Sequence, residues 1–196
     1  MAKCIWICSR QPFPKTVEEK ITNICNSISP DNIIPLEQQI NIGSNIAYGI
    51  MNPTNTILIH GNSLMLGKLI GDNDRWHEPG TDFPEGTYAL FRDSERYCEI
   101  ITDPVATRTI WYYHDENLFV ASTSQRAIIL YLGGFEFDDR VIPWMLSTGS
   151  LGPTLSWDKR IKRVPPDTSV ILDKKNWTIS INQIPVEFVE TKISDT

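Results

Sequence analysis

The chain has 196 residues, a length typical of one domain that buries about 70% of its unfolded surface. Hydrophobic residues make up 41% and charged residues 21% of the sequence, which excludes the collagen-like, disordered and low-complexity classes. The formal net charge is −6, and no dense Lys/Arg cluster is present, so we expect neither a nucleic-acid partner nor a membrane partner. We therefore predict a single domain over 1–196.

The amino-terminal residues and the cysteines indicate the compartment. Residues 1–8 lack the apolar core of a signal peptide, and the longest apolar run, 127–132, is far shorter than the roughly 20 residues that cross a bilayer. We therefore predict a cytoplasmic protein. The four cysteines form no CxxC pair and share no metal-ligand spacing with a histidine, which predicts reduced, mostly buried thiols and no metal site.

The first third of the chain predicts a strand, a helix and then further strands. The apolar, β-branched run 3–8 is typical of a buried strand. Thr16 and Glu19 have the spacing of a capping box, and apolar residues recur at helical intervals over 17–28, which predicts an amphipathic helix. From residue 31 onward, short runs rich in Ile, Leu, Val, Tyr and Phe alternate with turn residues and predict antiparallel strands.

The rest of the chain predicts an exposed loop followed by hairpins and short helices. The polar, turn-rich stretch 71–80 predicts the loop. Hairpins are predicted to join 87–91 to 97–101 through the turn 92–96, 110–113 to 118–121, and 169–172 to 177–181. One helix is predicted to open at the Ser122 and Gln125 spacing and to stop at Gly133. A second is predicted to run from Val141 to Gly149 with an apolar face.

Four motifs between residues 85 and 172 carry a family resemblance. In order, they read EGTYALFR over 85–92, ITDPVATRTIWYY over 101–113, LFVAS over 118–122 and IKRVPPD over 161–167. Their order and spacing resemble the amino-terminal class II glutamine amidotransferase domain of the asparagine synthetase-related proteins. The resemblance implies the N-terminal-nucleophile hydrolase fold, an α+β four-layer sandwich of two antiparallel β-sheets flanked by helices.

The same resemblance places the candidate nucleophile at Cys4. The family uses an amino-terminal cysteine whose own α-amino group is the general base. Removal of Met1 would expose Ala2, so catalysis by Cys4 would require a further cleavage after Lys3. A buried strand thiol is the alternative interpretation of Cys4.

The glutamine-binding motifs of the family are degenerate in this sequence. Neither R-G-P-D nor N-G-E occurs, and Leu66, Gly67 and Lys68 stand where N-G-E would fall. Only Gly67 therefore matches a substrate-binding position. A leucine cannot donate the hydrogen bond that an oxyanion requires, which argues against glutamine hydrolysis.

Four further residues are candidates for an interface. Asp103 and Arg108 flank the most family-like strand, and Arg163 precedes two prolines. They either shape an interface with a synthetase partner or form ordinary turn and surface ion pairs. Trp76 lies beside two titratable residues on the polar loop, where it either contacts a ligand or covers a sheet edge.

The resemblance implies a domain that works with an ATP-dependent synthetase, whose S-G-G-L-D-S-S loop does not occur in this chain. Our leading hypothesis is an amidotransferase-like pseudoenzyme without a cofactor, which has a structural or partner-docking role for an amide-forming synthetase in asparagine biosynthesis. One alternative is an active glutamine-hydrolysing domain that uses Cys4 after processing. The other is a stand-alone ligand-binding module. The sequence leaves open the identity of the acceptor substrate and whether the chain forms a homo-oligomer.

Overall fold

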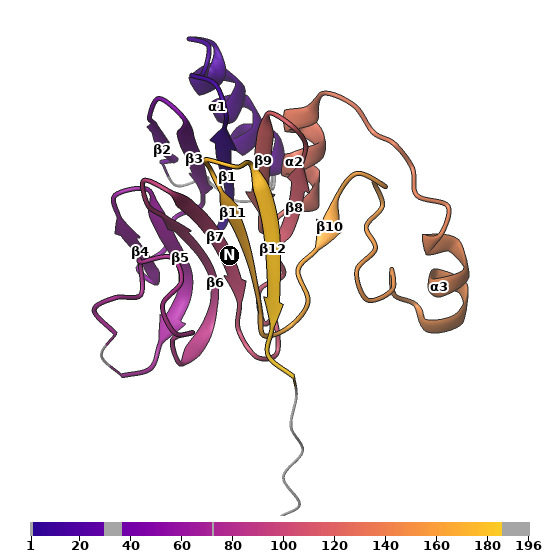
Figure 1. Cartoon of the computed structure of the whole chain (residues 1–196). Coiled ribbons are helices and arrows are strands. Elements are labelled where there is room, and N and C mark those ends of the chain that lie inside the picture. The colour runs from indigo at the N-terminus through magenta and orange to yellow at the C-terminus, as the bar shows by residue number, and fades with distance from the viewer. Residues whose placement is uncertain (1, 30–36, 72, 186–196) are drawn as a thin grey trace, which may run out of the picture.

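Two six-stranded antiparallel sheets form the centre of the structure, a computed structural model that describes residues 2–29, 37–71 and 73–185 (Figure 1). The first sheet has the strand order β10-β8-β9-β1-β3-β2. Its strands are β1 (Lys3–Ser9), β2 (Gln39–Ile42), β3 (Ile46–Met51), β8 (Trp111–His114), β9 (Leu118–Ser122) and β10 (Lys162–Arg163).

The second sheet has the order β12-β11-β7-β6-β5-β4. Its strands are β4 (Ile57–His60), β5 (Ser63–Leu69), β6 (Gly86–Asp93), β7 (Tyr97–Thr102), β11 (Thr168–Asp173) and β12 (Thr178–Gln183). The three predicted hairpins are confirmed as β6–β7, β8–β9 and β11–β12. The part of the expected strand region at 31–36 lies outside the described residues.

Strand β1 shows why the sequence forms two layers. Successive side chains of a strand point to opposite faces. Cys4, Trp6 and Cys8 therefore pack into the core between the two sheets. Ile5 and Ile7 pack on the other face, against the helices. Because both faces are buried, the strand reads as a continuous apolar run instead of an alternating one.

Helices α1 (Val17–Ile28) and α2 (Gln125–Leu132) cover the outer face of the first sheet (Figure 1). All five apolar residues on the predicted stripe of α1 are buried. The two predicted capping boxes are wrong. Thr16 makes no side-chain cap, and the residue that precedes α2 is Ser124. The Ser122 hydroxyl instead donates to the Cys4 carbonyl at 2.6 Å, so it joins two strands.

A loop covers the outer face of the second sheet. Four buried residues, Met65, Tyr88, Leu90 and Ile101, pack there against Trp76 and Phe83 of the segment that joins β5 to β6. The predicted α+β fold with two antiparallel sheets is confirmed. Within the described residues, helices form the outer layer over the first sheet, and this loop forms the outer layer over the second.

Helix α3 (Val141–Thr148) lies apart from both sheets, on the side of β10 (Figure 1). It ends as predicted at Gly149, which has a left-handed conformation. Most of its apolar face does not join the core. Val141 is buried, but Leu146 is 84% exposed. Over the described residues, no helix has both the length and the apolar character that crossing a membrane requires.

Candidate functional site

Cys4 lies at the beginning of β1 and is held as a strand residue. Its backbone nitrogen donates to the Thr123 hydroxyl at 3.0 Å, and its carbonyl accepts from the Thr123 nitrogen at 3.1 Å. The side chain is fully buried. Burial raises the pKa of the Cys4 thiol to about 12, although the hydrogen bonds from Thr123 oppose the shift. The group is therefore a thiol at neutral pH and a weak nucleophile.

The two residues before Cys4 belong to the folded structure. Lys3 is paired with Met51 across β1 and β3, and Ala2 is buried in the core between the sheets. The nitrogen of Cys4 is thus a peptide nitrogen, which cannot accept a proton as the α-amine of a terminal nucleophile does. In this structure the Cys4 thiol therefore lacks the α-amino base that an amino-terminal nucleophile requires.

A cavity of about 280 Å³ opens beside the amino-terminal end of β1. Its lining residues are Ala2, Lys3, Thr107, Arg108, Thr109, Trp111 and Thr123. Arg108 lines this cavity together with Ala2 and Lys3, the residues that precede Cys4. Burial raises the pKa of Cys4, and the charge of Arg108 opposes that shift. Two cations and three hydroxyl groups line the cavity, so its surface is suited to an acidic group.

Asp103 positions the segment that carries Arg108. The Asp103 carboxylate is fully buried and accepts hydrogen bonds from the backbone nitrogens of Tyr88 at 2.9 Å, Val105 at 3.1 Å and Thr107 at 3.1 Å. These contacts fix the turn after β7 and tie it to β6. Because the side chain does not reach the surface, Asp103 shapes this region through the turn and not by direct contact with a partner.

Gly67 lines a different cavity, of about 440 Å³, on the second sheet. Its φ is +142°, and a Cβ atom there would lie 2.1 Å from the Thr87 carbonyl oxygen. The close approach of β5 to β6 therefore requires a glycine whether or not a substrate binds. Beside it, Leu66 is buried between the sheets and Lys68 is exposed.

Trp76 and Arg163 lie on different sheets. Trp76 is half-buried and packs on the outer face of the second sheet. Arg163 pairs with Trp111 across β10 and β8, and its Nε atom is buried without a hydrogen-bond partner among the described residues. Arg163 shares the first sheet with Cys4, with β8 and β9 between their strands, whereas Gly67 and Trp76 belong to the other sheet.

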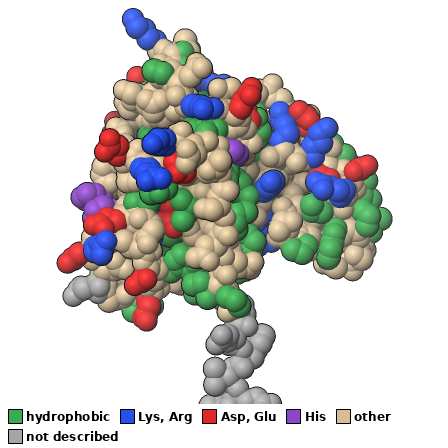
Figure 2. Space-filling view, viewed as in Figure 1, with side chains coloured by type: hydrophobic (Ala, Val, Ile, Leu, Met, Phe, Trp, Pro, Cys, Tyr) green, Lys and Arg blue, Asp and Glu red, His purple; other side chains and the backbone are tan. Residues whose placement is uncertain are grey.

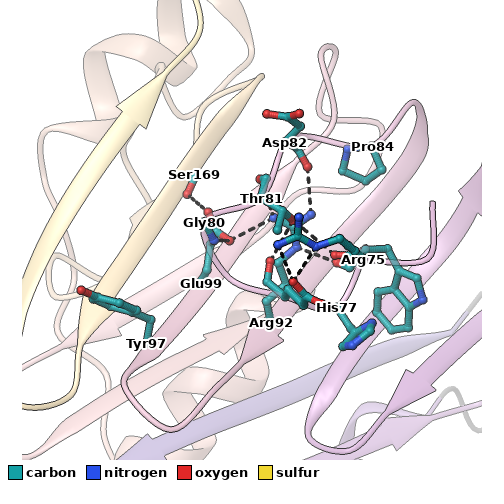
Figure 3. A network of polar contacts seen from close by, with 12 residues as sticks. Arg75, His77, Gly80, Thr81, Asp82, Pro84, Arg92, Tyr97, Glu99 and Ser169 are labelled. Atoms are coloured by element: carbon teal, nitrogen blue, oxygen red, sulfur yellow. Dashed lines mark hydrogen bonds and ion pairs between the residues drawn. The ribbon is translucent and has the colours of Figure 1, made fainter.

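A buried ion pair that the sequence analysis missed holds the Trp76 loop in place (Figure 3). Arg92 and Glu99 are 0% and 1% exposed, and Arg92 Nη1 lies 3.1 Å from Glu99 Oε2. The guanidinium also donates to three loop carbonyls, those of Trp76 at 2.6 Å, Thr81 at 3.0 Å and Asp82 at 3.1 Å. One side chain thereby binds three points of the loop.

The carboxylate of Glu99 completes this network. It accepts from the Gly80 nitrogen at 2.9 Å and from the Ser169 hydroxyl at 2.5 Å, so both of its oxygens have partners (Figure 3). The prediction that Arg92 begins the turn of this hairpin is wrong, since Arg92 belongs to β6. The available signal was the register, because Arg92 and Glu99 are opposite each other in the hairpin.

An exposed apolar surface surrounds α3, and we call it the arm patch. Its residues are between 36% and 84% exposed and comprise Phe135, Phe137, Ile142, Trp144, Met145, Leu146 and Trp157. Figure 2 shows hydrophobic side chains gathered over this arm and basic side chains beside it. Contiguous apolar surface of this kind marks interaction sites on soluble proteins.

Two short-range ion pairs anchor the arm. Asp138 binds Arg140 and Asp158 binds Arg160, each with two hydrogen bonds to the guanidinium. The hydrogen bonds from Arg140 hold the pKa of Asp138 below its ordinary value. Burial raises the pKa of Asp158, but its hydrogen bonds outweigh this effect and the net shift is downward. Both carboxylates are therefore ionised at neutral pH and fix the base of the arm.

Comparison with known proteins supports the fold. No protein-family model and no curated protein matches the chain. Among solved structures, it is similar to the glutamine phosphoribosylpyrophosphate amidotransferase from B. subtilis, with a TM-score of 0.52 and 10% identity over 92% of this chain and 49% of that chain. It is also similar to an allosteric regulatory enzyme of purine biosynthesis, with a TM-score of 0.50 and 9% identity over 92% of this chain and 48% of that one.

The chain spans about half the length of these two solved structures. At 9–10% identity the likeness concerns the fold and not the substrate or the reaction. The arrangement of two antiparallel sheets with helices over the first sheet agrees with it. The chain therefore shares its two-sheet α+β fold with the matched half of these two structures.

Proposed function

We propose that this chain is an amidotransferase-like domain of an asparagine synthetase-related protein that does not hydrolyse glutamine. Its role is structural, as a docking domain for an ATP-dependent, amide-forming synthetase. The observation that carries the proposal is the position of Cys4, a buried strand residue whose nitrogen lies in a peptide bond. The fold is that of a glutamine amidotransferase, but the nucleophile and its base are not on one residue.

The surroundings of Cys4 support the proposal. A thiol whose pKa is about 12 provides very little thiolate at neutral pH. The position expected to supply an oxyanion donor is Leu66, whose side chain lies in the core between the sheets. Glutamine hydrolysis requires both an activated nucleophile and such donors. A chain that lacks both would not carry out this reaction.

The proposal predicts that glutamine is not hydrolysed. The purified chain, Cys4→Ser and the control Cys8→Ser, which alters another buried thiol of β1, are each incubated with glutamine, and the glutamate released is measured. We expect all three to match the rate without protein. Release that Cys4→Ser abolishes and Cys8→Ser retains would establish the active alternative, in which Cys4 is the nucleophile.

The arm patch supports the docking role. It exposes two tryptophans and two phenylalanines, residue types that concentrate binding energy at protein interfaces. At its border lie two ion pairs of this chain, Arg140 with Asp138 and Lys159 with Glu136. A partner surface with an apolar centre and a polar rim is complementary to this arrangement. We assign it to the synthetase, as a separate subunit or a further segment of the same protein.

Photo-crosslinking in the native host tests this assignment. A photoreactive phenylalanine replaces Trp144 in the patch or Glu19, an exposed residue of α1, as the control. We expect position 144, but not position 19, to capture an ATP-dependent synthetase identified by mass spectrometry. Adding Leu146→Glu to the position-144 variant should reduce the yield of crosslinked synthetase about tenfold. This factor corresponds to a loss of about 1.4 kcal/mol of binding free energy at the interface. Capture of only a second copy of this chain contradicts the proposal.

A further inference from the structure

A cavity of about 290 Å³ is lined by residues of β12, in the second sheet, and of β8 and β10, in the first. These strands lie next to one another in Figure 1. Its volume is close to the lower limit of the range for small-molecule sites, which is about 300 to 1,000 Å³. Its lining residues are Tyr112, His114, Arg160, Lys162, Ile179 and Ile181. Four of these six carry polar hydrogen-bonding groups, and no carboxylate is among them.

Some polar groups of the cavity have ion-pair partners within the protein, and others do not. Arg160 is occupied, because its guanidinium binds Asp158 at 2.7 Å and Glu136 at 3.4 Å. Lys162 is exposed, and among the described residues it has no ion pair, while the Tyr112 hydroxyl makes no hydrogen bond to the protein. Lys162 therefore supplies one positive charge that the described part of the protein does not neutralise, and Tyr112, its partner across β10 and β8, supplies a donor next to it.

The opposite wall of the cavity is apolar. Ile179 and Ile181 are two residues apart on β12, so both side chains lie on the same face of the strand. Ile181 is 59% exposed, although β-branched residues of this type are usually buried. An aliphatic group in the cavity would remove this surface from water, which is favourable by about 25 cal/mol for each Å² buried.

We propose that this cavity binds a small organic monocarboxylate. The carboxylate is held by the Lys162 ammonium and the Tyr112 hydroxyl, and a short aliphatic portion lies against Ile179 and Ile181. One unneutralised cation matches one negative charge, which favours a carboxylate over a doubly charged phosphate ester. The proposal does not depend on the absence of glutamine hydrolysis, because none of these residues takes part in that argument.

His114 provides a readout of binding from inside the cavity. Burial lowers its pKa, the nearby Asp115 raises it and the nearby Lys162 lowers it, with a net downward shift. Arg160 and Tyr112 are the other titratable groups of the lining, and β12 contributes only apolar residues. A bound carboxylate would compensate the charge of Lys162 and favour the imidazolium, so the pKa of His114 should rise on binding.

The test is an NMR titration with hexanoate, in which the imidazole resonances of the three histidines are followed. We expect a saturable shift at His114, a higher pKa of His114 with ligand, and no change at His60 or His77. Lys162→Gln should raise the dissociation constant about tenfold, as expected for about 1.4 kcal/mol from one charge-assisted contact. Tyr112→Phe should weaken binding by a smaller factor.

Two controls define the outcomes that overturn the proposal. Lys20→Gln removes an exposed lysine of α1 that does not line the cavity, and it should leave the dissociation constant unchanged. Hexanol and inorganic phosphate replace hexanoate as the second control. The proposal is wrong if His114 shows no saturable shift, if Lys162→Gln binds hexanoate as the unchanged chain does, or if hexanol or phosphate binds equally well.

Discussion

Replacing Arg92 with methionine should lower the free energy of unfolding by about 3 to 5 kcal/mol, the usual effect of breaking a buried ion pair. The substitution would leave the Glu99 carboxylate buried without its cation, and the carbonyl groups of Trp76, Thr81 and Asp82 without their donor. The loss should therefore exceed that of one hydrogen bond, which is about 1 kcal/mol. Urea unfolding of both chains measures the difference.

Arg75→Gln is the matched control for this measurement. Arg75 also pairs with a glutamate, Glu78 at 2.7 Å, but the two side chains are 70% and 43% exposed. An exposed pair of this kind contributes at most about 1 kcal/mol. The double variant Arg92→Met with Glu99→Gln should regain part of the lost stability, because it removes the unpaired buried charge. Equal effects of Arg92→Met and Arg75→Gln would contradict the role assigned to the network.

Gly67→Ala should destabilise the chain by about 2 to 4 kcal/mol, because backbone strain and a forced shift of neighbouring atoms each cost about 1 to 3 kcal/mol. The new Cβ would lie 2.1 Å from the Thr87 carbonyl oxygen and 2.8 Å from the Tyr88 Cα. Both neighbours are backbone atoms of β6, so they cannot move without separating the two strands. Thermal and urea unfolding measure the effect.

Gly61→Ala is the control for the effect of conformation alone. Gly61 also has a positive φ, +57°, but no atom of the surrounding described residues lies within 4 Å of the place that a methyl group would take in the β4–β5 turn. The cost should be about 1 to 2 kcal/mol, that of a left-handed residue with a Cβ. If Gly67→Ala costs no more than Gly61→Ala, the close approach of β5 and β6 does not explain the glycine.

The parts of the fold that depend on local patterns could be predicted from the sequence. The stripe of α1 and the three hairpins follow from the spacing of apolar and turn residues over short distances. The separation of the strands into two sheets does not follow from such local spacing. Strands β3 and β4 are neighbours in sequence but belong to different sheets, and only long-range packing decides which strands pair.

The surroundings of Cys4 were predictable where they depend on a local pattern. The apolar run 3–8 predicted a buried strand thiol, and the structure shows the burial of Cys4 and its bond to Thr123. The hairpin register gave a signal for the Arg92–Glu99 pair but not for its burial, because an arginine beside turn residues usually faces water. The exposure of α3 was not predicted because its face is apolar. An apolar helical face indicates that the face is covered, but it does not show whether this chain or another protein covers it.

The chain isolated from its native host gives the most direct test of the central proposal, that the amidotransferase fold is present here without a working nucleophile. Its intact mass gives the first residue, and the same sample is assayed for glutamate release from glutamine. We predict that residues precede Cys4 and that no glutamate is released. A chain that begins at Cys4 and releases glutamate would contradict the proposal, because thiol and amine would then share one residue.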